Sequence, residues 1–338
     1  MITTRFYYEQ LNQRDKKIYK AIYDGIMNFK EYVEVPGVQL NENNVGWVYH
    51  CVLWDNPFIF SVGEYAMWHA LNDDKSRIKM TVLCDKHSEK VYRKELQDVV
   101  NKILASPKLQ QMSDFQKEVF VHDFIINNVE YDHTHGNGGA RIEPYTVYGA
   151  LVQKKAVCEG IAKATKLLLN LLDVKCIVVS GKFDGEGHAW NIVKLDDWEY
   201  NLDVTMDMGR VIHKGFMRYN YFNFRDSDIN NYEPDNNSMI PKCTAIGSNY
   251  MIKAGGFVSS YERLKIYIEK SLLKKKTCLY FKINRNVDDE YTNITFKDFQ
   301  NEINRAYSEV VNRLKINTQR FVDTTGPGEI VSVEITYI

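Results

Sequence analysis

The sequence lacks the features that mark several specialised classes of protein. Only 7 of its 338 residues are proline and 19 are glycine, which argues against long flexible linkers. Apolar residues form no run as long as a membrane span, and the first ten residues contain no apolar core of a signal peptide. We therefore expect a cytoplasmic protein without a membrane span; a secreted form that has lost its leader would have the same sequence.

Charge of one sign is not in excess either. The chain has 43 basic and 44 acidic side chains, and its formal net charge at pH 7 is −1. Nucleic-acid-binding proteins usually carry a basic surface. The basic run at residues 274–276 is short and ends an expected helix, where cations complement the helix dipole. The sequence thus argues against a nucleic-acid partner, and it does not indicate an oligomeric state.

The six cysteines include no CxxC pair, which excludes a zinc ribbon or knuckle. Four of them lie in apolar runs and are expected to be buried: Cys51, Cys84, Cys176 and Cys278. If Cys158 is a free nucleophile, five cysteines remain, which is an awkward number for a disulfide framework. The pattern favours a reducing compartment, and we expect neither a metal nor another cofactor.

Hydrophobic periodicity predicts an α+β protein. Ser113 begins an expected helix, and Gln116 completes a capping box with it. Cys158 begins another expected helix that runs to about residue 172. Three antiparallel strands are expected after it, at residues 175–181, 188–195 and 198–205. A helix followed by antiparallel strands is typical of the α+β class.

Three regions are expected along the chain. Residues 1–107 combine helical and strand patterns and are interpreted as an N-terminal α/β lead domain. Residues 108–235 hold Cys158 and the strands that follow it. Residues 236–338 are interpreted as a small α/β C-terminal domain with helices at 261–275 and 295–314 and strands at 277–284 and 330–338.

Three residues of the middle region have the chemistry of a nucleophile, a base and an orienting acid. A helix N-terminus favours an anion, so a thiolate at Cys158 is stabilised there. His188 follows a glycine-rich turn, where it can reach a helix tip, and Asp203 is expected on the neighbouring strand. An acid beside the imidazole fixes the tautomer that serves as base. Each residue alone is more often structural, so the argument depends on the three together.

The segments around these residues resemble the signature motifs of the transglutaminase-like superfamily. They are Ala-Val-Cys-Glu-Gly-Ile-Ala at 156–162, His-Ala-Trp-Asn at 188–191 and Asp-Val-Thr-Met-Asp at 203–207, in the family's order and at typical separations. The resemblance covers about residues 115–207 and implies a papain-like core in which Cys158, His188 and Asp203 are the catalytic triad. Two positions depart from the usual motif, Met206 and the loosened Trp-Glu-Tyr at 198–200; both bear on the shape of the cleft.

Acyl transfer also needs hydrogen-bond donors for the oxyanion. The backbone N–H of Cys158 is the natural first donor, and the second is expected to be the Tyr148 hydroxyl or the Gln153 amide, unless both are ordinary loop residues. Trp190 is interpreted as packing beside the triad or as a substrate contact. The residues His133 and His135 form a His-x-His pair, but no further ligands cluster with them, so a loop lining the cleft is favoured over a metal site.

The leading hypothesis is a cysteine peptidase or amidase that forms a thioester acyl-enzyme with a protein or peptide substrate. Water would resolve the acyl-enzyme in a peptidase, and a lysine amine would resolve it in a protein-crosslinking transglutaminase. The triad is common to both, although many bacterial members of the family resemble proteases. A non-catalytic binding module on the same fold is the hypothesis from another class, and the retention of all three triad residues argues against it.

Overall fold

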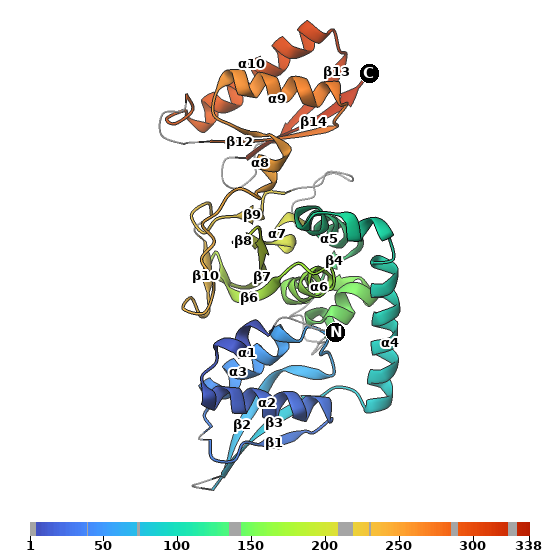
Figure 1. Cartoon of the computed structure of the whole chain (residues 1–338), viewed down its shortest axis with the longest axis vertical. Helices are drawn as coiled ribbons and strands as arrows, with labels where there is room; N and C mark the ends of the chain where they lie inside the picture. Colours follow the sequence, from blue (N-terminus) through green and yellow to red (C-terminus); the bar gives the residue numbers. More distant parts are fainter. Residues whose placement is uncertain are drawn as a thin grey trace. The chain divides into compact units, whose positions relative to one another are not determined.

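The protein has an α+β fold, described here by a computed structural model that covers residues 5–38, 40–72, 75–134, 143–208, 219–229, 231–284, 290–323 and 330–338 (Figure 1). The chain forms two compact units. The first comprises Met1–Gly209 and Asn231–Cys243, and the second comprises Arg210–Asn230 and Thr244–Ile338. The boundaries of these two units differ from those of the three expected regions, because the first 107 residues lie in the same unit as Cys158.

The N-terminal part of the first unit combines helices and a small antiparallel sheet. Its helices are α1 (Phe6–Gln10), α2 (Gln13–Met27), α3 (Glu42–Asp55) and α4 (Lys86–Ile103). Its strands, in the sheet order β1–β3–β2, are Tyr32–Glu34, Lys75–Val82 and Val62–Asn72. The Asn12 side chain caps α2 by accepting a hydrogen bond from the Asp15 N–H. The apolar face of α2 is buried in the core of the unit.

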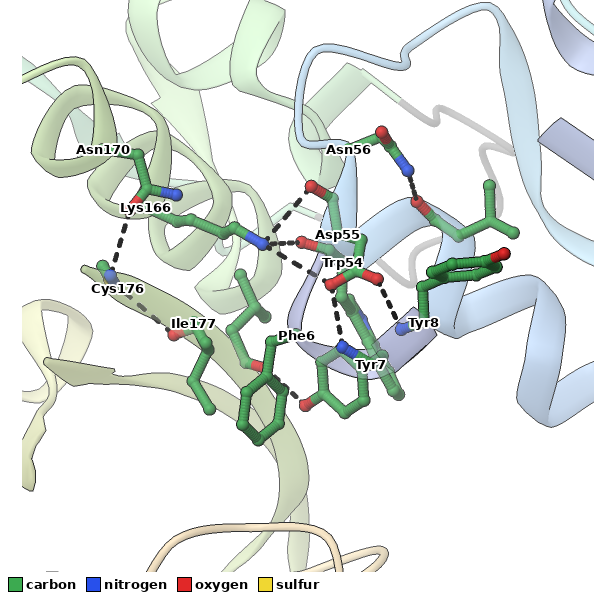
Figure 2. Close-up of polar contacts among 12 residues, drawn as sticks. Phe6, Tyr7, Tyr8, Trp54, Asp55, Asn56, Lys166, Asn170, Cys176 and Ile177 are labelled. Carbon is green, nitrogen blue, oxygen red and sulfur yellow. Dashed lines mark hydrogen bonds and ion pairs between the residues drawn. The ribbon is translucent and has the colours of Figure 1, made fainter. Parts of the chain in front are cut away.

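A buried polar cluster joins this N-terminal part to the helix that begins at Cys158 (Figure 2). The Lys166 ammonium donates to the backbone oxygen of Trp54 at 2.7 Å and lies 3.9 Å from the Asp55 carboxylate. That carboxylate also accepts hydrogen bonds from the backbone N–H groups of Tyr7 and Tyr8, at 3.1 and 2.9 Å. Burial lowers the pKa of Lys166 to about 8, against the opposing charge of Asp55. These contacts explain why the first 107 residues do not form a unit of their own.

The centre of the first unit is an antiparallel sheet with helices packed beside it. Its helices are α5 (Asp114–Asn128) and α6 (Cys158–Leu171). Its strands, in the order β10–β6–β7–β8, are Tyr232–Pro234, Cys176–Phe183, Glu186–Leu195 and Trp198–Leu202. The Asn191 side chain lies on β7 and donates to the backbone oxygens of Ala162 and Ile177, at 2.9 and 3.0 Å. It thereby fixes α6 against the sheet (Figure 1).

Short elements connect α5 to α6. They are β4 (Glu130–Tyr131), η2 (Glu143–Tyr145), η3 (Gly149–Gln153) and β5 (Lys155–Ala156), and a further short helix, η1 (Pro107–Gln111), precedes α5. The strands β4 and β5 pair in parallel, with Tyr131 opposite Ala156. The predicted capping box at the start of α5 is confirmed, since Ser113 and Gln116 exchange hydrogen bonds with each other's backbone.

Three details of the sequence prediction were wrong. The strand expected at 198–205 ends at Leu202, because the Asp203 side chain accepts the Met206 N–H at 3.0 Å and starts the short helix α7 (Val204–Met208). Cys84 and Cys278 are only partly buried, whereas the prediction placed both in the interior. All six cysteines are free thiols.

A buried histidine connects α5 to α7. The His122 ring nitrogens lie 3.1 Å from the Asp207 carboxylate and 2.9 Å from the Asp123 carboxylate. Burial alone would lower the pKa of His122, but the hydrogen bonds and charges of the two carboxylates outweigh it and raise the pKa to about 9. The imidazolium therefore holds the segment that follows Asp203 against α5.

The second unit is a four-stranded sheet with two long helices. Its helices are α8 (Tyr250–Ala254), α9 (Tyr261–Leu273) and α10 (Phe296–Leu314). Its strands, in the sheet order β11–β12–β14–β13, are Phe257–Val258, Cys278–Ile283, Ile330–Tyr337 and Thr318–Asp323. The short strand β9 (Phe222–Phe224) precedes them in the chain. The helices α9 and α10 cover one face of this sheet (Figure 1). The two helices and two strands expected in this region are confirmed, within two residues at each end. Among the described residues, no helix is long and apolar enough to span a membrane.

Candidate active site

Cys158 stands at the first position of α6, as predicted. The residue before it, Val157, has extended backbone dihedrals and carries no side-chain acceptor, so it leaves the first N–H groups of the helix uncapped by a side chain. Gly160 permits the close packing of this turn, because an added Cβ would lie 2.2 Å from the backbone oxygen of Pro144. The Cys158 side chain is half-buried, so it lies where a substrate can reach it.

His188 and Asp203 lie side by side. His188 occupies the early part of β7, where it pairs with Gly181 of β6, and Asp203 follows the end of β8. The distance from His188 Nε2 to Asp203 Oδ2 is 2.6 Å. The histidine side chain is 10% exposed and the aspartate 1% exposed, so the acid is enclosed while the base keeps an open side.

The thiol of Cys158 is near enough to the imidazole to contribute to the raised pKa of His188. Since Nε2 contacts Asp203, Nδ1 is the ring nitrogen left for the thiol. Burial by itself would lower the pKa of His188. The charge and the hydrogen bond of Asp203, followed by the influence of Cys158, outweigh burial and raise the pKa to about 10. A base of this kind holds a proton at neutral pH, which is the charge state needed beside a thiolate.

The structure adds a fourth residue that the sequence did not reveal. The Tyr232 hydroxyl, on β10, donates to Asp203 Oδ2 at 2.8 Å, the same oxygen that contacts His188. The β10 strand pairs with β6, which brings Tyr232 next to Phe183 at a ring distance of 4.7 Å. Tyr232 is 29 residues from Asp203 in the chain, so no spacing in the sequence pointed to it.

Trp190 lies beneath the triad histidine. Its ring is stacked against His188, with centroids 6.2 Å apart and an interplanar angle of 13°. The indole N–H donates to Asn201 Oδ1 at 3.1 Å, and the residue is 2% exposed. Trp190 is therefore almost wholly enclosed by its neighbours, which include His188 and Asn201.

Tyr148 and Gln153, the two predicted oxyanion donors, line one cavity. This cavity has a volume of about 280 Å³ and is also lined by Phe60, Leu83, Cys84, Tyr92, Glu143 and Thr146. The Tyr148 hydroxyl donates to Glu95 Oε2 at 2.5 Å, on α4. The hydroxyl of Tyr148 is therefore bound to helix α4. The helix η3 separates Tyr148 from Cys158 in the chain.

Another tyrosine, which the sequence analysis missed, lies at Cys158. Because Tyr131 is opposite Ala156 in the β4–β5 pair, its side chain comes next to the start of α6. Burial, followed by the charge of Cys158, raises the pKa of Tyr131. The residue directly precedes the polar loop that begins at Asp132, and that loop was the only hint in the sequence.

Of the polar loop that begins at Asp132, the structure describes residues 132–134. Among the described residues, no group of three or more His, Cys, Asp or Glu side chains is arranged to hold a metal ion. The ring of His133 packs on Tyr131 with centroids 4.9 Å apart, and the side chain of Asp132 accepts from Thr134 Oγ1 at 2.6 Å. His135 lies outside the described residues.

The middle of the chain matches a known family. Residues 102–202 match the sequence model of the transglutaminase-like superfamily. The search of curated proteins finds no match.

Two solved structures are similar over part of the chain. A structure described as that of a TGase has 18% sequence identity and a TM-score of 0.30, and the match covers 54% of this chain and 51% of that one. A candidate cysteine protease from Cytophaga hutchinsonii has 14% identity and a TM-score of 0.27, over 41% of this chain and 61% of that one. The chain thus spans between half and two thirds of the length of each protein. On the match to the family model, the chain carries a core of the transglutaminase-like superfamily within residues 102–202.

Proposed function

We propose that the protein is a cysteine-dependent acyl-transfer enzyme that cleaves amide bonds, with Cys158 as nucleophile, His188 as base and Asp203 as the acid that orients it. The observation that carries the proposal is the chain of contacts from the half-buried thiol through the imidazole to the enclosed carboxylate, 2.6 Å from Nε2. The thiol stands at a helix N-terminus, which favours its anion. The family match over residues 102–202 supports the same reading.

The contacts define the role of each group. Cys158 gives its proton to His188 and attacks the substrate carbonyl as a thiolate. Asp203 keeps the imidazole oriented and stabilises its charged form, as the raised pKa of His188 (about 10, set against burial by the charge and hydrogen bond of Asp203) indicates. The imidazolium then protonates the leaving amine, and a thioester remains on Cys158. Hydrolysis of the thioester makes the protein a peptidase or amidase.

The first test is the pH dependence of Cys158 alkylation by iodoacetamide, in the wild type and in His188→Ala. We expect Cys158 to react readily near pH 6 in the wild type and to lose that reactivity in the variant, because the imidazolium partner is gone. Cys84 serves as a control thiol within the same molecule, since burial raises its pKa and should leave it unreactive at pH 6. Digestion and mass spectrometry assign the label to each cysteine. Equal, ordinary reactivity of Cys158 in both proteins would contradict the proposed pair and favour a binding module.

The fate of the acyl-enzyme is measured next. Casein is incubated with the protein in the presence and absence of a fluorescent primary amine such as dansylcadaverine. Release of peptides in both samples supports hydrolysis. Incorporation of the amine without cleavage would instead assign the protein to the crosslinking transglutaminases, with the same triad.

A further inference from the structure

The proposed function leaves one cavity of the first unit without a role, the one that Tyr148 and Gln153 line. Three of its lining side chains are aromatic, and the ring of Tyr148 packs against the other two. Its centroid lies 5.7 Å from that of Phe60 and 5.2 Å from that of Tyr92, with interplanar angles of 37° and 53°. The three tilted rings therefore form one continuous wall. The volume of about 280 Å³ suits a small ligand.

The charged lining of this cavity is negative. Glu143 lines it, and in the described part of the chain no lysine, arginine or histidine does. The side chain of Glu143 has no ion-pair partner among the described residues. Arg93 lies 5.7 Å from the centroid of Phe60, but its guanidinium is paired with Glu89. A positive charge inside the cavity would thus meet an available carboxylate and no competing cation.

One tight turn holds the acidic and aromatic parts of the cavity together. The Glu143 carbonyl accepts the N–H of Thr146 at 3.0 Å and its hydroxyl at 2.8 Å. The same hydroxyl oxygen accepts the N–H of Gly149 at 3.1 Å. Gly149 follows Tyr148 directly, and an added Cβ there would collide with the Glu143 carbonyl oxygen. Glu143 and Tyr148 are therefore positioned before a ligand arrives, which lowers the entropic cost of binding.

Glu95 makes the ring of Tyr148 a better partner for a cation. The Tyr148 hydroxyl donates to Glu95 Oε2 at 2.5 Å. Burial, followed by the hydrogen bond and the charge of Glu95, raises the pKa of Tyr148 to about 12, so the phenol keeps its proton at neutral pH. A hydroxyl that donates to a carboxylate is polarised, and the electron density of its ring rises. The face of such a ring attracts a cation more strongly.

We propose that this cavity binds an organic ammonium ion, with the alkyl groups against the rings of Tyr148 and Tyr92 and the charge beside the carboxylate of Glu143. Aromatic rings recognise alkylated ammonium groups by this attraction. A metal ion such as Ca²⁺ is a poorer match, because it takes about six to eight oxygen ligands and the described lining offers a single carboxylate. Tyr92 is 39% exposed, so the wall can be reached from solvent.

Choline and its neutral carbon isostere, 3,3-dimethyl-1-butanol, test whether the cavity selects for charge. The two molecules have nearly the same shape and differ in the central nitrogen or carbon. Binding of each to the full chain is measured by isothermal titration calorimetry at pH 7 in phosphate buffer. We expect choline to bind at least about tenfold more tightly, from the rings and the carboxylate together. Its affinity should fall as salt screens the carboxylate.

Substitutions then place the bound cation in the cavity. Tyr148→Leu removes a ring and keeps an apolar side chain, so the Kd for choline should rise about fivefold. Tyr148→Phe keeps the ring and loses the bond to Glu95, and should raise the Kd by about twofold. Glu143→Gln should raise the Kd about threefold at low ionic strength and leave it unchanged at high ionic strength.

Two further tyrosines guard against misreading a loss of binding. Tyr65→Leu is the matched control, because Tyr65 is 70% exposed on β2 and does not line the cavity. Its Kd for choline should equal that of the wild type. Tyr92→Leu removes a more exposed ring of the same wall and should also raise the Kd about fivefold. It carries the test if circular dichroism shows that Tyr148→Leu does not fold.

Three results would overturn the proposal. Equal affinity for choline and its isostere would show an apolar cavity without a preference for charge. A choline affinity that neither Tyr92→Leu nor Glu143→Gln changes would place the ligand elsewhere on the protein. Absence of choline binding to the wild type would exclude the site. Because no triad residue lines the cavity in the described part of the chain, choline binding and the reactivity of Cys158 can each fail without the other.

Discussion

Lys166 allows a quantitative test of how the N-terminal part is fixed to helix α6. The perturbation is Lys166→Met, which keeps a long side chain and removes the charge. The variant loses the 2.7 Å hydrogen bond to the Trp54 oxygen and leaves Asp55 without its cation. Removing one partner of a buried ion pair typically costs about 3 to 5 kcal/mol. Asp55 keeps hydrogen bonds from Tyr7, Tyr8 and the Tyr19 hydroxyl, so we expect the lower end, about 3 kcal/mol.

A second substitution sharpens the test. Burial lowers the pKa of Lys166 to about 8, so the buried charge itself is costly. Neutralising both partners in Asp55→Asn/Lys166→Met should therefore be less destabilising than Lys166→Met alone, and within about 1 kcal/mol of the wild type. Lys194→Met is the control, because it removes a surface pair with Glu199 at 3.7 Å. Such a pair contributes less than about 1 kcal/mol.

The assay is urea unfolding at pH 7 followed by tryptophan fluorescence. All five tryptophans lie in the first unit, so the signal reports that unit and not the C-terminal one. The free energy of unfolding is obtained for the wild type and the three variants by linear extrapolation. A Lys166→Met protein within about 1 kcal/mol of the wild type, or a double variant as unstable as Lys166→Met alone, would refute the reasoning.

Two further predictions concern the residues around the triad. The pKa of His122 is raised from 6.5 to about 9 by its two carboxylate partners, against burial, so its stabilisation is complete below pH 6.5 and disappears as the pH rises through 9. The difference in the free energy of unfolding between the wild type and His122→Gln should be largest near pH 6, at most about 3 kcal/mol. It should shrink by pH 10, and a difference independent of pH would contradict this. Tyr232→Phe removes the 2.8 Å hydrogen bond to Asp203 and should slow acylation of Cys158 about tenfold while changing its pH profile, whereas an unchanged rate and profile would assign Tyr232 to packing alone.

The helices and strands were largely predictable because their signals are local. A capping pair such as Ser113 and Gln116 lies only three residues apart. The apolar residues of α6 recur at helical spacing within a single short segment of the chain. The same holds for the three signature segments at 156–162, 188–191 and 203–207, which predicted the residues that the fold brings together. The predicted end of one strand at residue 205 was wrong for a local reason also, because Asp203 caps a helix here where it could have continued the strand.

The partners of the triad were decided by contacts between distant residues. Tyr232 reaches Asp203 because β10 pairs with β6, and Tyr131 stands opposite Ala156, two residues before Cys158, because β4 pairs with β5. Lys166 lies 112 residues from the Trp54 carbonyl that it binds. No period or spacing records such pairings, because they follow from which surfaces the whole chain can bury together. The sequence therefore determined which residues carry the proposed chemistry, and only the tertiary structure decided which distant side chains, such as Tyr232, stand beside them.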